Sequence, residues 1–397
     1  MSVLFHSIRG WFVDPRSLID RGYSRCIQWR ETQKSHVKCR FKRQCFQILK
    51  SYYNVPASAA VDGGNKEMLQ KTEKPPKVTV RSVILDGTRS LVDSVRSLGY
   101  LKEETDAVKE PLPSQECRLA ALCEMAKELP LVDDEEQECC SQSLVAEDGC
   151  SSHVDLFSGL TENRTDRAAV VTLMGEEYVI PPHTAFLLSD FTRIQPLVHC
   201  EYGRMFDLVV MDPPWENKSV KRSRRYSCLP SSQLKRLPVP LLASPNCLVV
   251  TWVTNRPSHL RFVRDELYPH WGVEVVAEWF WVKVTTSGQF VFPLDSPHKK
   301  PYEMLVLGRY RPSVDLSTRF VPVEDQQLIV SVPSALHSQK PSLSEVLKPY
   351  VGAEAKCLEL FARSLQPGWT SWGNEVLKFH ISGCVLEPWM VIKAEMQ

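Results

Sequence analysis

The 397-residue sequence contains no pair of cysteines separated by two residues, although 13 cysteines are spread along it. This absence argues against a zinc ribbon and against a thioredoxin-type redox site. No apolar run approaches the roughly 20 residues that cross a bilayer. Arg9 and Asp14 interrupt the N-terminus, unlike a signal peptide. We therefore expect a soluble, intracellular protein with reduced thiols.

The sequence also lacks an excess of charge of either sign, because its 48 basic and 47 acidic residues give a net charge of +1. Hydrophobic residues make up 43% and charged residues 24%, which excludes collagen-like, fully disordered and disulfide-scaffold classes. The length favours two or three domains with enough chain to bury a core.

The balanced charge conceals two segments of opposite sign. Residues 21–50 hold nine basic residues and one acidic residue, a net charge of +8, whereas residues 103–155 hold fifteen acidic and three basic residues, a net charge of −12. Aromatic residues lie among the bases, at Tyr23, Trp29, Phe41 and Phe46. This pattern suits a phosphate backbone with stacked bases, but a solvated, poorly ordered arm has the same composition.

Composition and periodicity divide the chain into six segments. The amphipathic patterns at 79–99 and 117–129 predict helices, and no internal repeat is visible. The segments are a basic N-terminal arm at 1–53, a linker at 54–77, a mainly helical middle region at 78–131, an acidic loop at 132–165, an α/β domain at 166–384 and a C-terminal tail at 385–397.

The α/β domain is predicted from short apolar runs that alternate with helical patterns. Runs that barely alternate are typical of strands buried on both faces. The predicted strands are 169–174, 206–211, 247–253, 273–284, 303–308, 327–332 and 356–361. Helical patterns at 257–268 and 342–350 then predict a mostly parallel sheet with helices on both faces, whose site lies at the carboxyl ends of strands.

The strand predicted at 206–211 runs directly into Asp212, Pro213, Pro214 and Trp215. Asp212 supplies an acceptor carboxylate, and the two prolines fix the backbone so that the carbonyls of Asp212 and Pro213 converge on one point. Trp215 offers a face for a planar base, so the motif suits an exocyclic amine of an unstacked nucleotide. The alternative is a strand terminator with a core tryptophan.

The sequence resembles the adenine-N6 methyltransferase family marked by this motif, which includes the catalytic subunit of the messenger-RNA adenosine methyltransferase. The resemblance is carried by DPPWENKSVKRSRRYS (212–227), WVTNR (252–256), EVVAEWFWVK (274–283), FVFPLDSPHKKPYE (290–303) and LELFARSLQPGWTSWGNEVLKF (358–379). It implies a Rossmann-like methyltransferase domain that uses S-adenosylmethionine, with the motif placed before the cofactor strand in a permuted order. That strand would be Cys357–Ala362.

The resemblance also implies the cofactor contacts. By position these are Asp190 at the adenine, Asn374, Glu375 and Arg363 at the ribose and adenosine, Lys340 near the carboxylate, and Asp212. The glycine-rich loop of other methyltransferases is absent. Only Ser364 and Leu365 separate Arg363 from Gln366, where the RNA-methylating subunit has a longer, cofactor-contacting stretch.

Two basic loops are candidates for holding nucleic acid. The first follows the motif and contains Asn217, Lys218, Lys221, Arg222, Arg224 and Arg225, and the second contains His298, Lys299 and Lys300. Either loop could equally be a solvated surface segment. Trp279 and Trp281 share one face of a predicted strand, and we expect them to pack in the core.

These observations predict an enzyme that transfers a methyl group to the N6 of adenine in nucleic acid without a metal. The resemblance implies RNA, specifically an internal 2′-O-methyladenosine of U2 small nuclear RNA, with DNA adenine as an alternative substrate. A non-catalytic RNA-binding scaffold is the alternative of a different class.

We expect a monomer that acts without an obligate partner subunit, in the nucleus, with the cytosol or mitochondrion as alternative locations. The acidic residues 132–155 are expected to fold over the basic surfaces when no substrate is bound.

Overall fold

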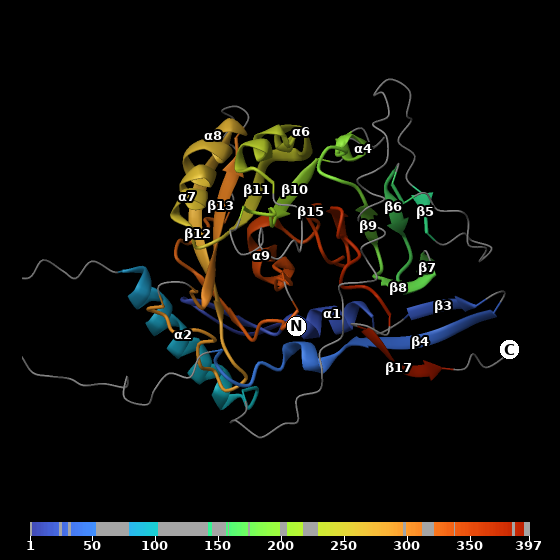
Figure 1. The fold of residues 1–397 in the computed structure, drawn as a ribbon, viewed down its shortest axis with the longest axis horizontal. Coiled ribbons are helices and arrows are strands. Elements are labelled where there is room, and N and C mark those ends of the chain that lie inside the picture. Colours follow the sequence, from blue (N-terminus) through green and yellow to red (C-terminus); the bar gives the residue numbers. More distant parts are fainter. Residues whose placement is uncertain are drawn as a thin grey trace, which may run out of the picture.

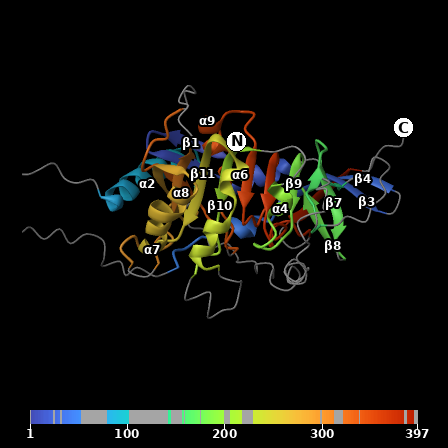
Figure 2. The same cartoon turned by 90° about the horizontal axis from the view of Figure 1, so that it is seen from above.

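The computed structural model shows an extended mixed sheet with helices on both of its faces, and a smaller sheet beside it (Figures 1 and 2). The structure describes residues 2–23, 26–30, 33–52, 79–101, 142–144, 156–157, 159–173, 175–198, 205–216, 229–296, 299–311, 321–336, 338–382 and 386–392. No helix within these ranges is long and apolar enough to span a bilayer.

Five parallel strands form the centre of the large sheet. In spatial order they are β11 (Ala243–Val253), β10 (Phe206–Met211), β15 (Cys357–Leu360), β16 (Trp369–Trp372) and β9 (Thr184–Leu187). Side chains of β10 point alternately to the two faces, and both faces are covered. Val209 and Met211 join one core cluster, whereas Leu208 and Val210 join another. This double burial explains the nearly continuous apolar run in the sequence.

The remaining strands of the large sheet extend it at both ends. They are β1 (Val3–Ser7), β2 (Gly10–Val13), β5 (Gln142–Ser143), β6 (Thr161–Asn163), β12 (Val273–Lys283), β13 (Tyr302–Tyr310) and β14 (Leu328–Ser331). The order is β1-β2-β14-β12-β13-β11-β10-β15-β16-β9-β6-β5. Strand β13 runs antiparallel to both of its neighbours, so the sheet is mixed. Trp279 and Trp281 are buried in the core, which confirms that prediction.

Helices cover both faces of the sheet, as predicted. On the face of Val209 lie α4 (Gln195–Val198), the 3-10 helix η3 (Ser231–Arg236), α6 (Val239–Leu242), α7 (Pro257–Arg261), the π-helical η4 (Phe262–Leu267) and α8 (Tyr268–His270). The last three are consecutive and form the helix predicted at 257–268. On the face of Val210 lies α9 (Ser344–Val351), the helix predicted at 342–350.

The smaller sheet has the order β17-β4-β3-β7-β8. Its strands are β17 (Leu386–Ile392), β4 (Gln33–Phe41), β3 (Cys26–Arg30), β7 (Ala168–Leu173) and β8 (Glu176–Ile180). The N-terminal basic segment therefore supplies strands to both sheets, through β1 and β2 and through β3 and β4. The helix α1 (Pro15–Gly22) lies between β2 and β3 in the chain, and the 3-10 helix η1 (Arg43–Phe46) follows β4.

The described part of the middle region is a single helix, α2 (Val80–Ser97), which corresponds to the helix predicted at 79–99. Thr79 caps its first turn by accepting a hydrogen bond from the Ser82 amide. Its apolar face, with Ile84 and Leu91, packs on β12 and β14. The predicted linker, the predicted helix at 117–129 and most of the acidic loop lie outside the described residues.

Candidate active site

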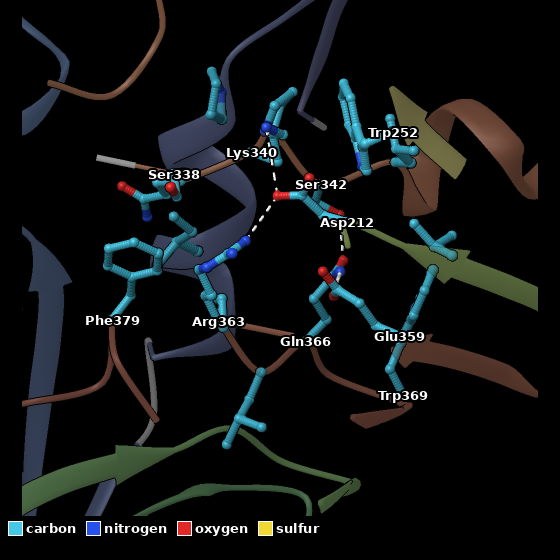
Figure 3. Close-up of a pocket in the computed structure, with 18 of the residues that line it drawn as sticks. Asp212, Trp252, Ser338, Lys340, Ser342, Glu359, Arg363, Gln366, Trp369 and Phe379 are labelled. Carbon is cyan, nitrogen blue, oxygen red and sulfur yellow. Dashed lines mark hydrogen bonds and ion pairs between the residues drawn. The ribbon is translucent and has the colours of Figure 1, made fainter. Parts of the chain in front are cut away.

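The side chain of Asp212 lies at the carboxyl end of β10, in the wall of a cavity (Figure 3). Its Oδ2 atom is 2.8 Å from Nη1 of Arg363 and 3.4 Å from Nζ of Lys340. All three side chains are largely buried, with 13%, 10% and 18% of their surfaces exposed. The sequence-predicted residues Asp212, Arg363 and Lys340 therefore meet in one cluster.

Arg363 follows β15 and connects two carboxylates. Its Nε donates to Oε2 of Glu375 at 3.0 Å, and Glu375 also accepts a hydrogen bond from Lys378 at 2.8 Å. Burial would raise the pKa of Glu375, but the charges of Lys378 and Arg363 outweigh burial and hold it below its ordinary value. The guanidinium is thereby fixed between Asp212 and Glu375.

Lys340 belongs to a second ion-pair chain. Its ammonium donates to Oε2 of Glu303 at 2.7 Å, and Lys283 donates to Oε1 of the same carboxylate at 2.5 Å. Burial lowers the pKa of Lys340, yet Asp212 and Glu303 outweigh burial and raise it above its ordinary value. Conversely, Lys283 and Lys340 hold the pKa of the buried Glu303 well below its ordinary value. Both groups are therefore charged at neutral pH.

The motif backbone folds into a tight turn. The amide of Trp215 donates to the carbonyl of Pro213 at 2.8 Å, and the amide of Leu229 donates to the carbonyl of Pro214 at 3.1 Å. A carbonyl oxygen has two lone pairs, so Pro213 keeps acceptor capacity for a further hydrogen bond. The turn holds this oxygen close to Asp212 in the chain with little freedom.

The indole of Trp215 is 4% exposed and packs inside the protein. Its Nε1 donates to the carbonyl of Trp252 at 2.8 Å, and its ring stacks on His259 with centroids 4.8 Å apart and planes 21° apart. Burial and the nearby Arg256 lower the pKa of His259. One face of Trp215 is therefore covered by a histidine, and the stacking of a substrate base on this side chain stays a prediction.

A second carboxyl group lines the same cavity and was missed from the sequence. Glu359, on β15, accepts a hydrogen bond from Nε2 of Gln366 at 2.9 Å. The hydroxyl of Ser342 donates to Oε1 of the same Gln366 side chain. Burial raises the pKa of Glu359 to about 7, although Gln366 lowers it. The sequence signal that could have identified Glu359 is its position as an acidic residue inside the apolar run 356–361. Buried carboxyls with perturbed pKa values concentrate at functional sites.

The other predicted cofactor residues lie along the same edge of the sheet. Asn374 and Glu375 follow β16, and Asp190 follows β9, so they stand at the carboxyl ends of the next two parallel strands. Asp190 accepts hydrogen bonds from the amide and hydroxyl of Thr192 at 3.2 and 3.3 Å. It does not line the cavity around Asp212, and neither does Asn374. Predicted site residues thus follow the carboxyl ends of the four neighbouring strands β10, β15, β16 and β9.

The predicted nucleic-acid contacts are described only in part. Asn217, Lys218, Lys221, Arg222, Arg224, Arg225 and His298 lie outside the described residues. Lys300 donates to the carbonyl of Leu294 at 3.1 Å, and Nζ of Lys299 is 5.5 Å from the ring centroid of Phe292. Within the described residues, no group of three or more His, Cys, Asp or Glu side chains could hold a metal ion.

An α/β sheet with an acidic motif beside a cavity at the carboxyl ends of its parallel strands fits a Rossmann-like methyltransferase. The model of the MT-A70 family matches residues 206–375, from the first residue of β10 to Glu375. This chain belongs to the MT-A70 family. The resemblance to this family found in the sequence is thereby confirmed.

Three relatives illustrate the range of the family. The mouse protein named N(6)-adenine-specific methyltransferase METTL4 is 54% identical over 310 residues, covering 76% of this chain and 65% of the mouse protein. The chain thus spans less than two thirds of that relative's length. A Cryphonectria parasitica protein named N6-methyladenosine RNA methyltransferase MTA1 is 38% identical, covering 56% of this chain and 73% of the relative. A Caenorhabditis elegans protein named DNA N6-methyl methyltransferase is 36% identical, covering 51% and 53%.

Proposed function

We propose that this protein transfers a methyl group from S-adenosylmethionine to the N6 atom of adenine in nucleic acid. The observation that carries the proposal is the Asp212 carboxylate at the end of β10, held between Arg363 and Lys340 at the wall of a cavity. Its support from the comparisons is the name of the mouse relative, an N(6)-adenine-specific methyltransferase.

The residues around the cavity fit S-adenosylmethionine chemically. The cofactor carries an amino acid, a sulfonium and an adenosine, so it needs both cationic and anionic partners together with apolar surface. Lys340 and Arg363 supply buried cations, and Asp212 and Glu359 supply carboxyls. Trp369 and Phe379 supply aromatic surface. The side chain of Gln339, 7% exposed, also lines the cavity, and its Oε1 has no hydrogen-bond partner in the described structure.

Lys340 and Arg363 would hold the cofactor's carboxylate and ribose side, with Glu375 as a further acceptor behind Arg363. When bound, S-adenosylmethionine supplies an electrophilic methyl group. Both ion pairs of Asp212 use Oδ2, and we propose that Oδ1 accepts a hydrogen of the adenine amine. We propose that the Pro213 carbonyl, which also accepts from the Trp215 amide, accepts the second hydrogen.

The chemical role of these two acceptors is to increase the nucleophilicity of the N6 nitrogen. Hydrogen bonds from both N6 hydrogens draw the nitrogen lone pair out of conjugation with the ring, which makes it a nucleophile. The proton released after methyl transfer passes first to Oδ1 of Asp212. The sulfonium charge disappears in the reaction, so positioning and acceptor placement account for most of the rate acceleration.

RNA is the proposed substrate, and an internal 2′-O-methyladenosine of U2 small nuclear RNA is its proposed target. The MTA1 relative is named as an RNA methyltransferase, which favours RNA. The name of the Caenorhabditis elegans relative makes DNA adenine the second candidate. Incubation of the protein with matched RNA and DNA oligonucleotides, followed by mass spectrometry of nucleosides, separates the two. A third RNA arm carries 2′-O-methyladenosine at the target position.

The test of the proposed reaction is Asp212→Asn, which keeps the size of the side chain but removes its charge. We expect transfer of a labelled methyl group to RNA to fall at least a hundredfold, because two buried cations lose their shared anion and the amine loses its acceptor. Asp265→Asn, at an exposed position of η4, is the matched control. Activity of Asp212→Asn near that of the control would refute the proposal.

The scaffold hypothesis makes the opposite prediction for the cofactor. An enzyme binds S-adenosylmethionine in calorimetry, whereas a scaffold does not. We further propose that the protein acts as a monomer in the nucleus. Sedimentation of the active protein and fractionation of cells test these two points separately.

A further inference from the structure

The loop after Arg363 is short, and it forms part of the wall of the cavity. Only Ser364 and Leu365 separate Arg363 from Gln366, and all four residues line the cavity together with Asp212. The carbonyl of Arg363 accepts a hydrogen bond from the amide of Phe379 at 3.3 Å. The chain around residue 379 therefore lies directly behind this loop.

The imidazole of His380 holds the loop in place. The amide of Leu365 lies 2.6 Å from Nε2, and Oγ of Ser364 lies 3.4 Å from the same atom. An amide N–H can only donate, so Nε2 is the acceptor and the proton of the neutral ring sits on Nδ1. Nδ1 then donates to the carbonyl of Val179 at 3.0 Å. The ring is 1% exposed, and burial lowers the pKa of His380 to about 4, which keeps the ring neutral.

Tyr23 extends this contact to the N-terminal segment. Its hydroxyl oxygen lies 2.6 Å from Nδ1 of His380, so it accepts the Nδ1 proton together with the Val179 carbonyl, and its ring is 2% exposed. Tyr23 comes directly after α1, and two residues of that helix region, Pro15 and Ile19, line the same cavity. The imidazole of His380 thus contacts three separate segments, the Ser364–Leu365 loop, β8 through Val179, and Tyr23 directly after α1.

We propose that His380 is a positioning residue that, with Tyr23 behind it, fixes the Ser364–Leu365 loop and thereby sets the affinity of the cavity for S-adenosylmethionine. This inference rests on the proposed function. The N-terminal segment, whose charge pattern suggested an RNA-binding arm, acquires a second role as a wall of the cofactor cavity. With only two residues between Arg363 and Gln366, the loop depends on the hydrogen bonds from His380 to keep its conformation.

The experiment compares His380→Leu, His380→Gln and Tyr23→Phe in the full chain by calorimetry with S-adenosylmethionine. Loss of the acceptor for the Leu365 amide in His380→Leu should raise Kd about tenfold. Gln keeps an acceptor near Nε2 and should recover part of this loss, and Tyr23→Phe should give a smaller increase. His270→Gln, at an exposed position of α8, is the matched control.

A readout of RNA affinity separates positioning from general damage to the fold. We expect KM for S-adenosylmethionine to rise while KM for RNA stays within twofold, and circular dichroism to remain native. A folded His380→Leu protein with wild-type cofactor affinity overturns the inference and leaves the proposed function standing. If His380→Leu does not fold, an unchanged Kd in both other variants overturns it. Wild-type protein that binds no S-adenosylmethionine overturns the proposed function and this inference with it.

Discussion

The guanidinium of Arg363 donates to the carboxylate of Asp212 at 2.8 Å, although 151 positions separate the two residues in the chain. Parallel pairing of β10 with β15 produces this contact, because each residue follows the carboxyl end of its strand. The same guanidinium reaches Glu375 through Nε. A single planar group therefore connects the motif to the segment that follows β16, the neighbour of β15 in the sheet.

Arg363→Lys should lower methyl transfer tenfold to about a hundredfold, which corresponds to the loss of one charged hydrogen bond. The ammonium of lysine is a point charge and cannot reach Asp212 and Glu375 with the fixed geometry of a guanidinium. Steady-state assays with saturating RNA measure the effect. Arg261→Lys, at an exposed position of α7, is the control, and equal rates in the two variants would contradict the prediction.

The pair of Lys340 and Glu303 provides a second prediction. Lys340→Met should lower the free energy of unfolding by about 3 kcal/mol, because it leaves partly buried carboxylates with one cation fewer. Glu303→Gln should cost less stability in this variant than in wild type, because its ion pair with Lys340 is already absent while Lys283 loses its partner in both backgrounds. Methyl transfer should stay low in the double variant. Urea unfolding of the two single variants and the double variant measures the coupling.

Lys356→Met, at an exposed position before β15, is the control for the loss of a lysine and should change stability by less than about 0.5 kcal/mol. Stability losses that add up in the double variant would contradict the assigned ion pair between Lys340 and Glu303. Recovery of methyl transfer in the double variant would show that Lys340 serves only to neutralise Glu303.

The central strands and the motif were predictable because both follow from local patterns. An apolar run that is buried on both faces reads as a strand, and a parallel strand delivers the next residue, here Asp212, to the carboxyl edge. Asn374 and Asp190, in contrast, were assigned from the family resemblance, because the strands that precede them, β16 and β9, were not among the predicted strands. Only the placement of Asp212 followed from the order of residues along a predicted strand.

The contribution of the N-terminal residues to the sheet was not predictable, because it depends on pairing with distant strands. Gly10 pairs with Leu328, and a Cβ atom at position 10 would lie 2.0 Å from the carbonyl oxygen of Leu328. Glycine is needed there, but the sequence does not reveal the approaching strand. His380 was missed for the same reason, since its partners Tyr23, Val179 and Leu365 come from three separate segments.

Trp215 offers a test of how far the motif tryptophan acts through packing. Trp215→Phe keeps an aromatic ring against His259 but removes the hydrogen bond from Nε1 to the Trp252 carbonyl. We expect a loss of about 1–2 kcal/mol in the free energy of unfolding, and a larger loss for Trp215→Leu. Chemical unfolding measures both variants. Stability equal to wild type in Trp215→Phe would mean that the hydrogen bond contributes nothing.

Glu359 predicts a specific dependence of stability on pH. Its pKa is raised from the ordinary value of 4.5 to about 7 by burial, so between these two pH values the folded protein holds a proton that the unfolded chain releases. The stabilisation from the neutral carboxyl is complete below pH 4.5 and is lost as the pH rises through 7. Glu359→Gln, which is neutral at every pH, should match wild type near pH 5 and be more stable than wild type at pH 8. Unfolding curves at the two pH values decide this, with the exposed Glu354→Gln as control. If the difference between Glu359→Gln and wild type is the same at both pH values, the carboxyl does not titrate near neutrality, and the cavity wall beside Asp212 carries an ionised Glu359 throughout.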